Sequence, residues 1–117
     1  MELKEYQERA MTTCMPSSNN FSYMFLNLVG EVGEFASKVA KSIRKEENSI
    51  EYNELGVIEN DKELQKEAGD ILWQLSGLCT VMGWSLEDVA QQNLDKLAAR
   101  KAIGTIDGNG DGIIRGK

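Results

Sequence analysis

The stretch that decides the fold is "LVGEVGEFASKVAK", residues 28–41. Its apolar side chains recur every three or four positions, which is the spacing of one face of an amphipathic helix. The spacing continues on both sides, so we predict a helix over residues 22–45. Glu31 and Glu34 form a pair of acids three apart, with a glycine just before the second acid. A glycine inside a helix costs about 1 kcal/mol relative to alanine, so helix formation alone does not explain this pair.

A second stretch, "LQKEAGDILWQL" at residues 64–75, repeats the arrangement with Glu67 and Asp70. Its apolar spacing predicts another long helix over residues 61–82. Side chains three apart on a helix are about 60° apart around its axis, so each acid pair projects from one side. If the two helices pack antiparallel, both pairs can face one polar pocket. The glycines would then admit a neighbouring backbone or a ligand.

Four carboxylates in one pocket are tolerable only if cations neutralise them. An all-oxygen ligand set suits Mg²⁺ or Mn²⁺ better than zinc. The chain has no histidine, which removes the commonest zinc ligand, the usual general base and every Ser-His or Cys-His nucleophile. The alternative is that each acid pair is ordinary solvated helix surface.

Shorter helices are predicted over residues 2–14 and 85–101, and no stretch predicts a strand. We therefore expect an all-α fold, a four-helix-type bundle built on two long central helices. It forms a single domain over residues 1–117, with the helical bundle over 1–103 and a flexible, glycine-rich tail over 104–117. The central helices are apolar around more than one face, as helices buried on several sides are. We expect a homodimer or homotetramer.

The overall charge and composition exclude several classes of partner. The net charge of −6 argues against binding a nucleic-acid backbone, which needs a basic surface. No stretch approaches the roughly 20 apolar residues that span a bilayer, and the charged start lacks a secretory signal. We expect no membrane partner and a cytoplasmic location. Cys14 and Cys79 have no metal-type spacing and are expected to be free, half-buried thiols.

The last predicted helix carries a row of polar side chains on one side. Asn93 falls within its apolar arc, and Lys96 and Arg100 follow at i+3 and i+7. An amide, an ammonium and a guanidinium suit a polyphosphate. The alternative is a buried asparagine bonded to backbone, with two basic side chains extending past the core. Trp73, about 60° around its helix from Asp70, either stacks on a base or packs in the core or a subunit interface.

Three segments together carry a family resemblance: "LVGEVGEFASKVAK", "LQKEAGDILWQL" and "NLDKLAAR". They resemble the MazG family of all-α nucleoside triphosphate pyrophosphohydrolases, whose hallmark is Glu-x-x-Glu on one helix and Glu-x-x-Asp on the next. The resemblance extends from about residue 20 to the C-terminus. It departs from the family in the 32 residues between Glu34 and Glu67, more than the family commonly carries. We interpret the surplus as a surface insertion around residues 46–60.

The resemblance implies magnesium-dependent hydrolysis of a canonical or non-canonical (d)NTP to the nucleoside monophosphate and pyrophosphate, with Mn²⁺ as an alternative ion. The implied metal ligands are Glu31, Glu34, Glu67 and Asp70. Glu31 and Glu34 are assigned as catalytic, because an acid at the edge of the metal would orient the attacking water. The implied substrate-binding residues are Asn93, Lys96, Arg100, Trp73 and, from the tail, Arg115. Alternatives are a non-catalytic helical interaction module and a related phosphoribosyl-ATP pyrophosphohydrolase. No motif encodes the preferred base or sugar.

Overall fold

The computed structural model describes residues 1–46 and 61–104, and these ranges are all-helical. The helices are α1 (Leu3–Met11), α2 (Phe21–Glu46), α4 (Asp61–Val81) and α5 (Leu86–Ala102), with a 3₁₀ turn at Pro16–Ser18. The predicted all-α class is confirmed, and each of these four helices begins and ends within a few residues of its predicted bounds. None of the described helices is both long and apolar enough to cross a lipid bilayer.

Two helices begin at polar caps that the sequence marks. The Asn20 Oδ1 atom accepts a hydrogen bond from the backbone N–H of Tyr23 at 2.8 Å, at the start of α2. The Ser85 Oγ atom accepts one from the backbone N–H of Asp88 at 3.2 Å, at the start of α5. Each bond satisfies an N–H that has no partner within its own helix. Gly83, with φ of 75°, makes the left-handed turn between α4 and α5, where a side chain would be strained.

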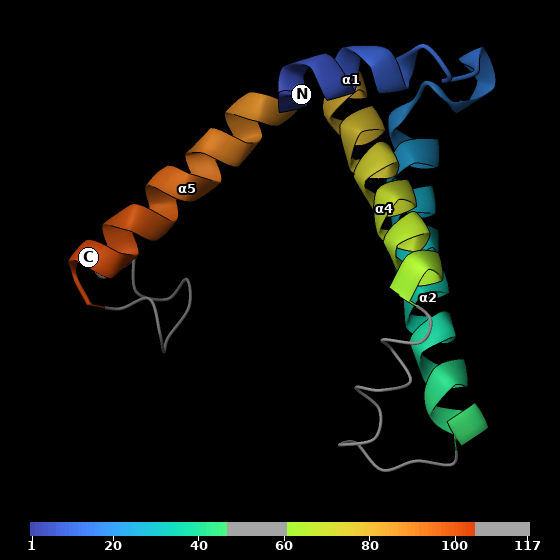
Figure 1. Cartoon of the computed structure of the whole chain (residues 1–117). Helices are drawn as coiled ribbons and strands as arrows, with labels where there is room; N and C mark the ends of the chain where they lie inside the picture. The colour runs from blue at the N-terminus through green and yellow to red at the C-terminus, as the bar shows by residue number, and fades with distance from the viewer. Residues whose placement is uncertain (47–60, 105–117) are drawn as a thin grey trace.

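The long helices α2 and α4 lie side by side and antiparallel (Figure 1). They pack tightly at Gly77, where an added Cβ would lie 2.6 Å from the Cε atom of Met24, a side chain with no exposed surface. At Gly33 and Gly69 an added Cβ would meet nothing within 4 Å. Of the two explanations predicted for those glycines, close approach of a neighbouring backbone is wrong within the described chain, and approach of a ligand stays a prediction. The glycine that close packing requires is Gly77, two turns after Gly69 on α4.

Helix α1 lies across the end of the α2–α4 pair (Figure 1) and is bonded to α4 through side chains. The indole N–H of Trp73 lies 3.1 Å from the backbone oxygen of Ala10 and 3.0 Å from Thr13 Oγ1. The amide of Gln7 donates to Thr80 Oγ1 at 2.9 Å. These bonds satisfy polar atoms of both helices, so α1 is fixed to the C-terminal half of α4.

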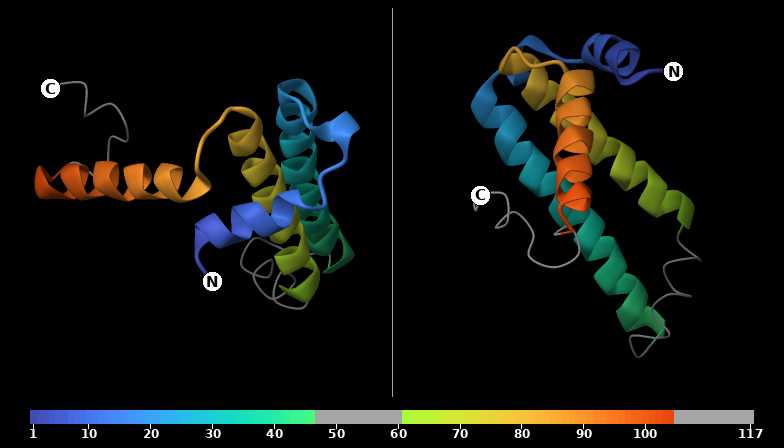
Figure 2. Two further views of the ribbon diagram at one scale, coloured as in Figure 1. Left: turned by 90° about the horizontal axis from the view of Figure 1, so that it is seen from above. Right: turned by 90° about the vertical axis from the view of Figure 1, so that its left-hand side faces the viewer.

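Helix α5 leads away from the α2–α4 pair, as Figure 1 and the left view of Figure 2 show. Its start is held by Gln7, whose amide donates to the Trp84 backbone oxygen at 3.0 Å and accepts from the Leu86 N–H at 2.8 Å. The described part of one chain therefore differs from the predicted four-helix bundle. Its fourth helix is attached at one end and packs little against the others.

The apolar side chains of α2 divide between two faces, one packed on α4 and one left uncovered by the described chain. Met24 is fully buried against α4, whereas Phe25, Val29 and Val32 are about half exposed. The reason is geometric, because α4 covers only one side of α2. We call the uncovered residues the outer stripe: Phe21, Phe25, Leu26, Val29 and Val32. The rings of Phe21 and Phe25 stack with their centroids 5.6 Å apart.

The two cysteines are both free thiols, as expected. Cys14 is partly exposed, which agrees with the prediction of a half-buried side chain. Cys79 is more deeply buried than predicted, with 1% of its surface exposed. Met24, Leu64 and Leu86 are likewise buried.

Candidate metal centre

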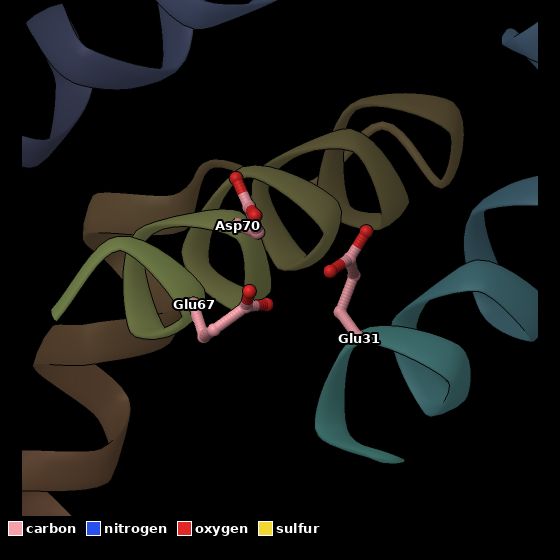
Figure 3. Close-up of side chains that lie close together, drawn as sticks. All are labelled: Glu31, Glu67 and Asp70. Atoms are coloured by element: carbon pink, nitrogen blue, oxygen red, sulfur yellow. The ribbon is translucent and has the colours of Figure 1, made fainter. Parts of the chain in front are cut away.

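Three of the four predicted acids converge where α2 and α4 lie side by side. Glu31 extends from α2 toward α4, and Glu67 and Asp70 come from successive turns of α4 (Figure 3). One carboxylate oxygen of each residue lies within 4.8 Å of those of the other two. Glu31 and Glu67 are partly buried and Asp70 is exposed. The spacing of three in "EAGD" places both α4 acids beside the single acid that α2 supplies.

Glu34 stands apart from this group. Its side chain is exposed, and it is not among the carboxylates whose oxygens approach within 4.8 Å. Its charge nevertheless contributes to the raised pKa of Glu31, so it lies close enough to influence the cluster. The role of Glu34 as a metal ligand stays a prediction.

The electrostatics of the cluster favour a bound cation. The pKa of Glu31 is raised, first by burial and then by the negative charges of Asp70, Glu67 and Glu34. Both effects disfavour the ionised carboxylate, and a divalent cation reverses them. The donor set of described acids is made entirely of hard oxygen atoms, the ligands that Mg²⁺ and Mn²⁺ prefer. The residues present therefore fit such an ion.

A pair of amides adjoins the cluster within the helix interface. The Asn27 Nδ2 atom donates to Gln74 Oε1 at 2.7 Å, and Gln74 is 3% exposed. Asn27 lies four residues before Glu31 on α2, and Gln74 lies four residues after Asp70 on α4. Because buried amides need partners, this bond fixes how the helices face each other. The sequence prediction missed the pair, although its spacing of four from each acid was a usable signal.

The opposite end of the cluster carries a cation that the sequence prediction also missed. Lys38 Nζ lies 3.5 Å from Glu67 Oε2 and 3.8 Å from Glu63 Oε1. Lys38 follows Glu31 by seven residues, which is two helical turns on the same side of α2. The acids are thus flanked by an amide pair on one side and an ammonium on the other.

Helix α1 faces the Asp70 side of the cluster. The pKa of Tyr6 is raised, first by burial and then by the charge of Asp70, which places this phenol near the acids. Trp73 uses its indole N–H to bond α1, which agrees with the packing alternative considered for it. Stacking of Trp73 on a nucleotide base stays a prediction.

The three predicted substrate-binding residues of α5 are not brought to the acids within one chain. Asn93 and Lys96 are exposed and Arg100 is buried, with 8% of its surface exposed. Because Asn93 is exposed, the alternative in which it is a buried core residue is wrong for this chain. All three lie on the helix that leads away from α2 and α4 (Figure 2). Arg115 and residues 47–60, most of the predicted insertion, lie outside the described residues.

Comparison with known proteins places this geometry in a family. Residues 19–103 match the family described as MazG nucleotide pyrophosphohydrolase domain. The chain is also similar to the "Gene 37 protein" of Mycobacterium phage L5, with 40% identity over 95 residues, covering 81% of this chain and 78% of the phage protein. No solved structure matches significantly. The family match spans α2, α4 and α5, and so includes the acid cluster and the polar row of α5.

Proposed function

The chain belongs to the MazG nucleotide pyrophosphohydrolase family, and from that premise we propose that it hydrolyses a nucleoside triphosphate, canonical or non-canonical, to the monophosphate and pyrophosphate. The observation that carries the proposal is the convergence of Glu31, Glu67 and Asp70, with oxygens within 4.8 Å of one another. Carboxylates this close repel one another, and a bound cation would relieve that repulsion. Three acids from two helices sharing one place favour a site for a divalent cation.

Glu31, Glu67 and Asp70 would hold Mg²⁺, with Mn²⁺ as an alternative. A bound divalent cation supplies charge neutralisation for the phosphate oxygens and fixes their position. Contacts between α2 and α4 hold the three carboxylates in position for the ion. The Asn27–Gln74 hydrogen bond holds the two helices in register, so the three carboxylates need little rearrangement on binding.

The proton of the attacking water would pass to a carboxylate. Glu34 suits this role because it is exposed and lies one turn along α2 from Glu31. As the water oxygen bonds to the α-phosphorus, the bond from that phosphorus to the bridging oxygen breaks. Pyrophosphate leaves with the bridging oxygen. Glu34 would orient the water and accept its proton at a carboxylate oxygen, while Glu31 acts as a ligand.

We also propose that the active form is a homodimer or larger homo-oligomer. The cations of α5 lie away from the acids of their own chain, so a second copy is one way to bring such cations to the cluster. The outer stripe of α2 offers the apolar surface for this contact, since all five of its side chains are at least 45% exposed. Exposed apolar surface of this kind is typical of an interface.

Assembly through the outer stripe would increase the mass of the particle in solution. Light scattering coupled to size exclusion tests this proposal, and a monomer at all working concentrations would rule it out.

The test of function is a pyrophosphate-release assay across canonical and non-canonical (d)NTPs with Mg²⁺. We expect pyrophosphate from at least one nucleotide, with none when the metal is chelated. The Asp70→Asn variant should lose turnover. Glu8→Gln, which removes one charge from an exposed position on α1, serves as the matched control and should retain it. Orthophosphate as the product would contradict the assigned bond cleavage, and no product from any nucleotide would favour the non-catalytic alternative.

A further inference from the structure

The ammonium of Lys38 lies between two carboxylates of unequal importance. One is Glu67, a member of the acid cluster, at 3.5 Å from Nζ. The other is Glu63, which lies one turn earlier on α4 and outside the cluster, at 3.8 Å. The side chain of Glu67 is 15% exposed and that of Glu63 is 53% exposed. Lys38 thus contacts one partly buried site acid and one solvated acid, and either can serve as its partner.

The charge of Lys38 acts differently on the empty and the loaded cluster. Without a cation, the ammonium offsets part of the repulsion among Glu31, Glu67 and Asp70, because an opposite charge within about 4–6 Å favours the ionised form. A divalent cation neutralises two of the three negative charges, and the ammonium is then a like charge beside the ion. Lys38 therefore stabilises the empty site more than the loaded one.

We propose that Lys38 is a resident counter-ion of the cluster, which gives up Glu67 when the divalent cation binds and then pairs with Glu63. The inference rests on the proposed function only in taking the cluster as a divalent-cation site. Lys38 is a positioning residue, because it acts through Glu67. It sets the cation concentration at which the site fills. Glu63 is the second partner, and it lowers the free-energy cost of releasing Glu67.

The direct test is titration of Mg²⁺ into the full chain by isothermal calorimetry, without nucleotide. Lys38→Met should lower the apparent Kd for Mg²⁺ about 3- to 10-fold, the range expected for removing one charge near a partly exposed site. Lys38→Arg keeps the charge and should stay within about twofold of the natural chain. Lys66→Met is the matched control. Lys66 contacts Glu63 at 3.4 Å and is 73% exposed, so its loss removes the same charge without touching Glu67.

The role of Glu63 is tested by a double-mutant cycle. Glu63→Gln should raise the apparent Kd for Mg²⁺ about two- to threefold, because Lys38 then has only Glu67 as a partner. In the Lys38→Met background the same change should have a smaller effect. The difference between the two backgrounds isolates the exchange from the general loss of negative charge.

Thermal melting in metal-free buffer gives an independent readout. Lys38→Met should melt lower than the natural chain there, and saturating Mg²⁺ should recover most of the loss. An unchanged or raised Kd for Mg²⁺ in Lys38→Met would overturn the proposal, as would an equal loss of stability with and without the metal. Both readouts are free of catalysis, so failure of the pyrophosphate assay would leave this test intact.

Discussion

Removing one acid from the cluster should stabilise the metal-free protein. We take Glu31→Gln, which keeps the shape of the side chain and removes the charge that α2 contributes. Glu31 is the natural choice because its pKa is raised by burial and by the acids around it. Its ionised form is therefore held at a cost when no cation is present.

The size of the effect follows from the spacing of the carboxylates. At a separation of 4.8 Å in a medium of dielectric constant 80, each like-charged pair costs about 0.9 kcal/mol. Glu31 takes part in two such pairs, with Glu67 and Asp70, and physiological salt reduces their sum to about 1 kcal/mol. For a domain of this size that gain raises Tm by about 4 °C.

The assay is thermal melting followed by circular dichroism, with a chelator and again with Mg²⁺. In chelator, Glu31→Gln should melt above the natural chain. In Mg²⁺ at 100 times its Kd, the natural chain gains about 2.7 kcal/mol and the variant, which lacks one ligand, gains less. The order of the two melting temperatures therefore reverses. Glu8→Gln should show neither effect. A Glu31→Gln variant that melts lower in chelator would refute the reasoning and assign this glutamate a structural role.

Three further predictions test the packing around the centre. Gly77→Ala should destabilise the chain by about 1–3 kcal/mol, because the new Cβ overlaps the buried side chain of Met24; an unchanged urea midpoint would contradict this. A disulfide reagent at pH 8 should modify one thiol per native chain, Cys14, and two per unfolded chain, since burial both shields Cys79 and raises its pKa. Equal reactivity of the two thiols in the native chain would contradict the burial of Cys79. The raised pKa of Cys79 also contributes stability that is present below the usual thiol pKa and is lost as pH rises through the folded pKa. Trp73→Phe removes the indole N–H that bonds α1 and should cost about 1 kcal/mol; an altered nucleotide KM with unchanged stability would instead favour base stacking.

The sequence predicted the local structure and the acids well because both depend on short spacings. The periodicity around "LVGEVGEFASKVAK" located α2. Three of the four acids in the two pairs lie together, and Glu34 lies apart from them. Periodicity reports which side of a helix is apolar, but it does not report what covers that side. The outer stripe was therefore grouped with the buried face of the same helix.

The direction of α5 and the contacts of Lys38 could not be predicted in the same way. The path of α5 depends on the hydrogen bond between Gln7 and Leu86, which are 79 positions apart. The pairing of Lys38 with Glu67 depends on the register between α2 and α4. That register depends on the Asn27–Gln74 hydrogen bond and on Gly77, beside which the Met24 side chain packs. No short pattern marks that glycine as different from the others.

The fixing of α5 at one end makes this helix a lever. Its 17 residues span about 26 Å at 1.5 Å per residue. A rotation of about 10° at Ser85 would move the far end by about 4.5 Å over that length. The pivot of this rotation is the side chain of Gln7, which is hydrogen-bonded to Trp84 in the turn before α5 and to Leu86, the first residue of α5. Natural variation at Gln7 would thus change the reach of Lys96 while leaving every acid of the centre in place.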